Sequence, residues 1–194
     1  NRTTSTFDAA GQRTVVTNAL GKRTTAVFDA AGRTIGSIDP LGNRVTLGYD
    51  VASQRIRTIN PLGKITTSVY DAVGHVQASI TPLGFRTTLS YDAAGQRTAL
   101  RDANNKLTTT IYDSVGRPQA TIDANAKRTS SVYDAAGRRI AIIDANSNRN
   151  TFTLDDAGRT TRRTDPLGRR TSFSFDAANQ QTLRIDARGN RTSY

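Results

Sequence analysis

An aromatic residue followed by aspartate recurs every 21 residues along this 194-residue chain, with leucine in the aromatic position once and without an insertion or a deletion. The aromatic column is occupied by Phe7, Phe28, Tyr49, Tyr70, Tyr91, Tyr112, Tyr133, Leu154 and Phe175. A fixed period of this length indicates a repeat architecture, in which each unit packs on its neighbours. We therefore predict a single uninterrupted array over residues 1–194, made of about nine 21-residue repeats.

Each repeat contains two turn signals, which we call the first turn and the second turn. The first turn has the pattern Asp-Ala-Ala-Gly, as in residues 92–95, and the second has the pattern Asp-Pro-Leu-Gly, as in residues 39–42. Aspartate at the first position of a turn accepts local backbone N–H groups, and glycine at the fourth position tolerates a positive φ. The predicted structural turn residues are Asp8, Gly11, Asp29, Gly32, Asp50, Asp71, Gly74, Asp92, Gly95, Asp113, Gly116, Asp134, Gly137, Asp155, Gly158 and Asp176.

The stretches between the turns are short and rich in Thr, Val, Ile and aromatic residues, which favour β-strands. Examples are "RTTAVF" at 23–28 and "RRIAII" at 138–143. All 16 acidic residues are aspartate, and aspartate favours turns over helices. We predict an all-β fold, an antiparallel meander with two strands and two tight turns in each repeat. A parallel β-roll solenoid is an alternative, because two short turns in each lap can also close a solenoid.

Few apolar columns are available to form a core. The predicted core residues are Phe7, Phe28, Tyr49, Tyr70, Tyr91, Tyr112, Tyr133 and Phe175, together with Ile38, Ile59, Ile80, Ile122, Ile143 and Ile185. A third apolar column is the leucine row of the second turn, formed by Leu20, Leu41, Leu62, Leu83 and Leu167. This apolar surface is too small to offset the entropy of ordering one repeat, so no repeat is expected to fold alone. We expect a sheet with one thin apolar layer, curled into a spiral tube or hollow shell.

The sequence offers no constellation of residues for catalysis. His75 is the only histidine, and its column otherwise holds arginine or glutamine, so we interpret it as a solvated residue on the sheet. The aspartates recur at turn positions, which favours a turn role over acid–base chemistry or a calcium site. The chain has no cysteine and no glycine-rich phosphate loop. We therefore predict no enzyme activity, no cofactor and no metal.

The net charge of +11 raises the question of anionic partners. Much of the positive charge lies in one column, the arginine row, formed by Arg2, Arg23, Arg44, Arg86, Arg128, Arg149, Arg170 and Arg191. We expect these arginines to pair with aspartates of neighbouring turns, and binding of anionic polysaccharide is the alternative. Nucleic acid is disfavoured because aromatic residues do not interleave with the arginines. No apolar run approaches the roughly 18 residues that a membrane helix needs.

The motif Tyr-Asp-x-x-Gly-Arg, followed by Thr and then Asp-Pro-Leu-Gly-Asn-Arg, resembles the YD repeat of the Rhs family. Good matches lie at residues 91–98, 133–138 and 39–44, and the resemblance covers the whole chain. The family includes bacterial Rhs polymorphic toxins, cocoon subunits of insecticidal toxin complexes, wall-associated bacterial proteins and animal teneurins. The resemblance implies a β-hairpin strip that spirals into a hollow shell on secreted or surface-exposed proteins. In the toxins, that shell encloses a C-terminal payload released by self-cleavage.

Two features depart from the shells of this family. The spacing does not vary over eight consecutive steps, and equal units related by a constant operation build a tube or helix that need not close. Neither end carries an atypical capping repeat, which suggests a window of a longer array. We therefore expect a structural module of an extracellular or cell-surface fibre, stalk or spacer that self-assembles into a filament. A segment of a toxin-encapsulating shell and a polysaccharide-binding adhesion module are the alternatives.

Overall fold

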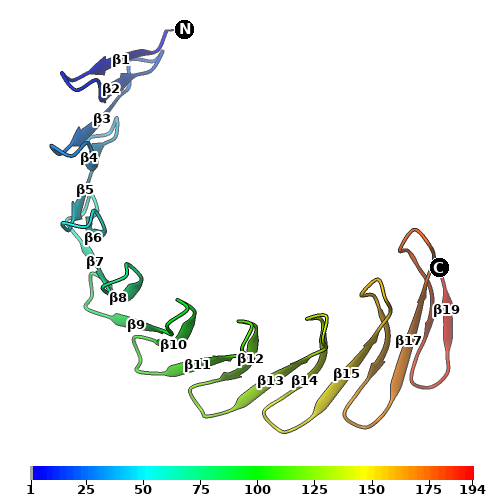
Figure 1. The fold of residues 1–194 in the computed structure, drawn as a ribbon. Helices are drawn as coiled ribbons and strands as arrows, with labels where there is room; N and C mark the ends of the chain where they lie inside the picture. Colours follow the sequence, from blue (N-terminus) through cyan, green and yellow to red (C-terminus); the bar gives the residue numbers. More distant parts are fainter. Residues whose placement is uncertain (1) are drawn as a thin grey trace. The chain divides into compact units, whose positions relative to one another are not determined.

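The computed structural model describes residues 2–194, which form 19 β-strands and no helix (Figure 1). The strands up to residue 91 are β1 (Thr4–Phe7), β2 (Arg13–Thr17), β3 (Arg23–Phe28), β4 (Thr34–Ile38), β5 (Arg44–Tyr49), β6 (Arg55–Ile59), β7 (Ile65–Tyr70), β8 (Val76–Ile80) and β9 (Arg86–Tyr91). The others are β10 (Arg97–Arg101), β11 (Leu107–Tyr112), β12 (Pro118–Ile122), β13 (Arg128–Tyr133), β14 (Arg139–Ile143), β15 (Arg149–Leu154), β16 (Thr160–Thr164), β17 (Arg170–Phe175), β18 (Gln181–Ile185) and β19 (Arg191–Ser193).

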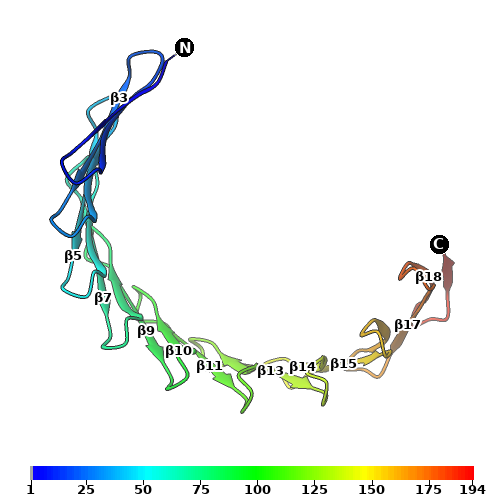
Figure 2. The same ribbon diagram turned by 45° about the horizontal axis from the view of Figure 1, so that its top comes forward.

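The strands belong to two compact units. The first unit contains the residues up to Ser90 together with Leu100–Asn105, and the second contains Tyr91–Ala99 and Lys106–Tyr194. Strands β1 to β8 of the first unit pair antiparallel, each with the next in sequence, and so do strands β11 to β19 of the second. The predicted all-β antiparallel meander is thus confirmed, and the parallel β-roll alternative is wrong. In both views each unit is a single layer of strands, with no other described element over either face (Figures 1 and 2).

Most turns are closed by their own aspartate, and three second turns have Asn18, Asn60 or Thr81 in its place. In the first turn of the second repeat, the N–H of Gly32 donates to the carbonyl oxygen of Asp29 at 3.0 Å, and the N–H of Asp29 donates to the carbonyl oxygen of Arg33 at 3.0 Å. The Oδ1 atom of Asp29 also accepts the N–H groups of Ala31 and Arg33 at 3.0 and 2.9 Å. The side chain therefore satisfies two backbone donors that the tight turn would leave without a partner.

The fourth turn position requires a left-handed backbone. Gly32 has φ +79° and Gly42 has φ +86°. Where the sequence departs from glycine, the replacing residue keeps the same conformation, with φ between 60° and 65°. These residues are Ser53, Asn105, Ala126, Ser147 and Asn179. Most of the replacements are small polar residues, whose side chains can form local hydrogen bonds that offset the strain of this region.

The register places the two predicted core columns on opposite faces of the sheet. Thr25 lies opposite both Val15 and Ile38, so these three side chains share one face, which we call the isoleucine face. Phe28 lies three residues after Thr25 on the same strand, and side chains alternate along a strand. The aromatic column therefore lies on the other face, which we call the aromatic face. A register shift next to Phe28 marks a β-bulge in β4.

Burial in this single layer is slight. The buried apolar residues of the described chain share one column of the isoleucine face: Val15, Ala78, Ala120 and Ala141. No large side chain is fully buried among residues 2–194. The predicted aromatic and isoleucine core residues are half-buried, except for Phe7, which is 58% exposed. The expectation that the second-turn leucines join the apolar layer is wrong, because they point away from the sheet edge and are 74–83% exposed.

The left-handed position of the second turn gives a direct test of the turn geometry. At Gly42 a Cβ atom would meet nothing within 4 Å, so a substitution there changes backbone strain without a steric clash. We expect Gly42→Val to lower the free energy of unfolding by about 1–2 kcal/mol, because a β-branched residue resists positive φ. Gly42→Asn, which mimics Asn105, is the matched control and should cost less than half as much. Urea unfolding followed by circular dichroism measures both, and equal effects would contradict the assigned conformation.

Candidate functional site

The residue after the first turn connects neighbouring repeats at several positions along the chain. We call these nine residues the clamp column: Gln12, Arg33, Gln54, His75, Gln96, Arg117, Arg138, Arg159 and Gln180. Arg33 shows the full set of contacts. Its Nε atom donates to the Oδ2 atom of Asp29 in its own turn at 2.7 Å. Its NH1 group reaches the first turn of the next repeat, where it donates to the carbonyl oxygen of Asp50 at 3.1 Å and to the Oγ atom of Ser53 at 2.9 Å.

The same bridge recurs in the second unit. The NH1 groups of Arg138 and Arg159 donate to the carbonyl oxygens of Asp155 and Asp176 at 2.8 and 3.0 Å. Each of these arginines also pairs with the aspartate of its own turn through a 2.7 Å contact. The aspartate fixes one side of the guanidinium group, so the other side is held toward the next turn. Charge-assisted hydrogen bonds of this kind are stronger than neutral ones.

The clamp arginines also cover the aromatic column. The guanidinium carbon of Arg33 lies 4.9 Å from the centre of the Tyr49 ring, which belongs to the next repeat. The equivalent distances are 4.7 Å from Arg117 to Tyr133 and 5.1 Å from Arg159 to Phe175. Such cation–π contacts are favourable within about 6 Å. One side chain therefore joins a turn, a neighbouring turn and an aromatic ring.

The tyrosines of the aromatic column add a second link between repeats. The hydroxyl groups of Tyr49, Tyr70, Tyr112 and Tyr133 each donate to a backbone carbonyl oxygen 15 residues earlier, at 2.9–3.1 Å. For Tyr49 the acceptor is Thr34. Thr34 lies at the β-bulge of β4 and precedes the residues of β4 that pair with β5. The hydroxyl group therefore binds the backbone of the preceding repeat, and this bond fixes the ring in place.

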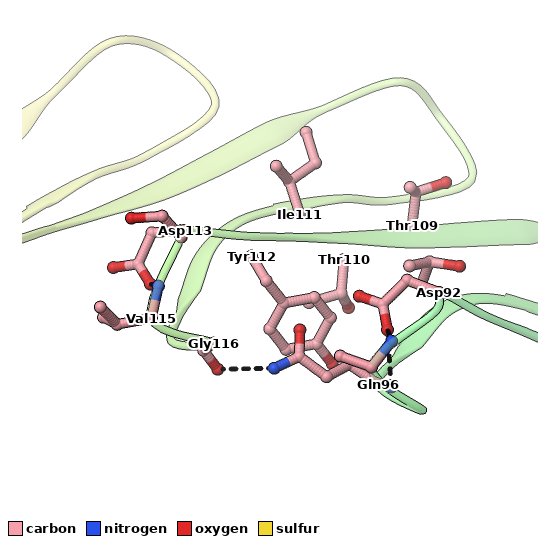
Figure 3. Close-up of a pocket in the computed structure, with 12 residues that line it drawn as sticks. Asp92, Gln96, Thr109, Thr110, Ile111, Tyr112, Asp113, Val115 and Gly116 are labelled. Carbon is pink, nitrogen blue, oxygen red and sulfur yellow. Dashed lines mark hydrogen bonds between the residues drawn. The ribbon is translucent and has the colours of Figure 1, made fainter.

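Glutamine at the clamp position makes a weaker bridge and leaves a groove. The Nε2 atom of Gln96 donates to the carbonyl oxygen of Gly116 at 3.4 Å (Figure 3). The groove beside it has a volume of about 710 Å³, and the equivalent groove beside Gln54 has about 600 Å³. Beside Arg117 the groove is only about 270 Å³. The longer guanidinium side chain thus fills space that glutamine leaves open.

The clamp residue also restricts the glycine of the next first turn. A Cβ atom on Gly74 would lie 3.1 Å from Nε2 of Gln54, and one on Gly137 would lie 3.3 Å from NH1 of Arg117. Both approaches are tight, whereas the described second-turn glycines have open space at this position. Ser53 replaces glycine where Arg33 binds its hydroxyl group, and Asn179 does so where Arg159 binds its Oδ1 atom at 2.9 Å. A side chain at this position is therefore accommodated as a partner of the clamp arginine.

The hydrogen bonds of the turns lower the pKa of nine turn aspartates: Asp29, Asp39, Asp71, Asp113, Asp134, Asp144, Asp155, Asp165 and Asp186. For Asp29, Asp113 and Asp134, the largest cause is the backbone N–H of the clamp arginine, and the guanidinium group adds to it against partial desolvation. For Asp155 the largest cause is the hydrogen bond from the side chain of Arg159. Hydrogen bonds to the ionised carboxylate favour its charged form. These turns therefore depend on ionised aspartate.

Sequence reasoning missed the clamp column and assigned ion pairing to other arginines. The ion pairs of the described residues do not involve the arginine row, so the expectation that this row pairs with neighbouring turns is wrong. Arg44 and Arg128 of that row instead contact the hydroxyl groups of Thr46 and Ser130. His75 occupies the clamp position, and its Nδ1 atom lies 3.1 Å from Oδ2 of Asp71. One sequence signal could have indicated the clamp column: a long side chain that can donate hydrogen bonds recurs four residues after the aspartate of each first turn.

The chemistry of this site is that of a repeated intramolecular bridge. Among residues 2–194, no three His, Cys, Asp or Glu residues lie close enough together to hold a metal ion. The described chain also contains no helix long and apolar enough to cross a membrane. The predicted turn aspartates and glycines lie in the first turns, and the predicted aromatic residues lie beside them on the aromatic face.

Comparison with known proteins gives one family. The model described as RHS Repeat matches residues 28–65, 70–107, 112–149 and 155–192, so each match covers just under two 21-residue repeats. No curated protein matches the chain.

Two solved structures have a similar fold. The crystal structure of TcdB2-TccC3 has a TM-score of 0.64 at 15% identity, over 94% of this chain and 11% of that chain. The Tc holotoxin pore of Photorhabdus luminescens has a TM-score of 0.56 at 15% identity, over 99% of this chain and 14% of that chain. This chain thus spans a small part of either structure, and the likeness concerns the fold.

Removal of one clamp arginine tests the bridge. We expect Arg159→Ala to lower the free energy of unfolding by about 1–3 kcal/mol, because it removes charge-assisted hydrogen bonds to the next repeat. Arg169→Ala is the matched control. Arg169 pairs with Asp165 at 2.6 Å, but its side chain is 63% exposed, and within residues 2–194 it has no hydrogen bond to another repeat. Its loss should cost about 0–1 kcal/mol, as for surface ion pairs. Equal losses in denaturant unfolding would argue against a bridging role.

Acid should weaken the turns in a narrow range of pH. An aspartate with a lowered folded-state pKa contributes stability that is complete above its unfolded pKa, about 3.9, and is lost as the pH falls through the folded value. We expect the Tm to be nearly constant between about pH 7 and 5 and to fall below about pH 4. Thermal melting at a series of pH values measures this. His75→Gln, which restores the residue of neighbouring repeats, is the control for titration of the histidine. A fall above pH 5 that persists in this variant would contradict the prediction.

Proposed function

The chain belongs to the RHS repeat family, as its Tyr-Asp motif predicted, and we propose that it is a structural module, a wall segment within a larger assembly of such repeats. One observation carries the proposal: side chains of the clamp column and of the aromatic column form hydrogen bonds from one repeat to its neighbour. A clamp arginine such as Arg138 binds a backbone carbonyl 17 residues later. With no large side chain fully buried in residues 2–194, a repeat has little internal core to stabilise it.

The comparisons support a shell-type assembly as the larger structure. The similar structures are components of toxin complexes, and this chain covers 11% and 14% of their lengths. In this proposal, the repeats contribute a stretch of shell wall, and their partners are further repeats of the same kind. The proposed location is secreted or at the cell surface. The module has no catalytic role of its own in this proposal.

A fibre, stalk or spacer is the second candidate, and the constant spacing favours it. Nine equivalent positions follow one another at intervals of 21 residues. Identical contacts between equal units generate the same rotation and translation at every step, which leads to an open helical assembly unless the rotation closes. A closing shell needs a change of radius, which a constant unit length does not supply.

Electron microscopy of the native protein that contains these repeats tests the proposal. A hollow closed particle would support the shell wall, and a uniform filament with an axial repeat would support the fibre. Both outcomes agree with a structural module. A compact globular particle without a layer of repeats, or an activity abolished by substitution of turn aspartates without loss of folding, would contradict it.

A further inference from the structure

A concave site with four arginines lies between two neighbouring second turns of the second unit. Its volume is about 300 Å³. The lining residues are Arg163, Asp165, Arg169, Thr171, Arg184, Asp186, Ala187 and Arg188. Arg163 comes from β16 and Arg184 from β18, the two strands that flank β17.

The register places both strand arginines on the aromatic face. Arg163 lies opposite Thr171, and Arg184 lies opposite Phe173, two residues further along β17. Thr171 and Phe173 share the face of Phe175 because side chains alternate along the strand. The two arginines are thus two strands apart on one face, at a spacing of roughly 10 Å. The arginine row lies on the opposite face, as the pairing of Arg170 with Thr164 shows.

Three of these arginines depart from the repeat pattern. The column of Arg163 and Arg184 holds uncharged residues in the seven earlier repeats: Val16, Ser37, Thr58, Ser79, Leu100, Thr121 and Ile142. The column of Arg188 holds leucine or asparagine in every other repeat, at Leu20, Leu41, Leu62, Leu83, Asn104, Asn125, Asn146 and Leu167. Since the other repeats form the same strands and turns without these arginines, the fold does not require them.

The guanidinium groups of these three arginines form no ion pair within the described chain, although the charge of Arg184 helps to lower the pKa of Asp186. Arg169 is paired with Asp165 at 2.6 Å, and the carboxylate of Asp186 accepts the side-chain amide of Asn190 at 2.9 Å. The ion pairs of the described chain do not include Arg163, Arg184 or Arg188. Arg163 makes a long hydrogen bond of 3.4 Å to Asn150. The groove therefore presents an excess of positive charge.

We propose that this groove binds a segment of an acidic polysaccharide, with its sulfate or carboxylate groups held by Arg163, Arg184 and Arg188. The planar guanidinium fork matches oxyanions of this geometry. The carboxylates of Asp165 and Asp186 have free lone pairs that accept sugar hydroxyl groups. Nucleic acid is disfavoured as the occupant because no aromatic side chain lines the groove to stack on bases. This binding function goes beyond the structural role proposed above.

Calorimetric titration with a heparin hexasaccharide at about 0.15 M salt, where long-range attraction is screened, tests the proposal. The site variant is Arg163→Thr, Arg184→Thr and Arg188→Asn, which installs residues that other repeats carry. We expect at least roughly tenfold weaker binding, because one charge-assisted hydrogen bond is worth about that factor. The control variant is Arg23→Gln, Arg86→Gln and Arg149→Gln, which removes equal charge from the arginine row. It should retain binding within about twofold of the parent.

Three outcomes of the binding measurements would overturn the assignment. Equal weakening in the two variants would show attraction by net charge alone. No detectable binding of the hexasaccharide to the parent would remove the site. Tighter, site-dependent binding of a single-stranded oligonucleotide of equal charge would assign the groove to nucleic acid.

Phenylglyoxal modification of the unsubstituted protein is a second readout. We expect the hexasaccharide to protect Arg163, Arg184 and Arg188 and leave Arg23 and Arg86 reactive, and protection of all five would contradict the proposal.

Discussion

The array depends on contacts that join each repeat to the next, and the bond from a clamp arginine to the backbone of the next turn is the clearest of them. A single layer of strands has no second layer to pack against, so its stability must come from strand hydrogen bonds and from side chains that reach across repeats. Arg159 makes several such contacts with one side chain: it binds the carboxylate of Asp155, the carbonyl oxygen of Asp176 and the side chain of Asn179. The aspartate that closes one turn thus also orients the group that secures the next.

Variation in the clamp column changes the surface without changing the fold. Arginine covers the neighbouring aromatic ring, as Arg117 covers Tyr133, whereas glutamine at positions 54 and 96 leaves larger grooves. The strand lengths and turns beside both kinds of clamp are the same. A repeat array of this kind can therefore alter its surface chemistry one repeat at a time, as the arginines at positions 163 and 184 also show.

The fold could be predicted because its signals are local in sequence and repeated. The clamp contacts could not be predicted, because they join residues that are close only in the folded structure. The Asp-x-x-Gly pattern and the alternation of β-forming residues predict turns and strands from short-range chemistry alone. The partner of Arg33 lies 17 to 20 residues away, and only the strand register shows that the two first turns are adjacent. The leucine row was misjudged for a related reason, since hydrophobicity alone does not show that Leu41 projects from the sheet edge.

The dependence of stability on the number of repeats tests the central claim most directly. Arrays of four, six and eight repeats, begun at the same position within the repeat, differ only in how many neighbour contacts they contain. If stability resides between repeats, the free energy of unfolding should rise with every repeat added, as in a nearest-neighbour chain. Denaturant unfolding of the three arrays measures this. Equal free energies for the four-repeat and eight-repeat arrays would mean that each repeat carries its own stability, which would contradict the account.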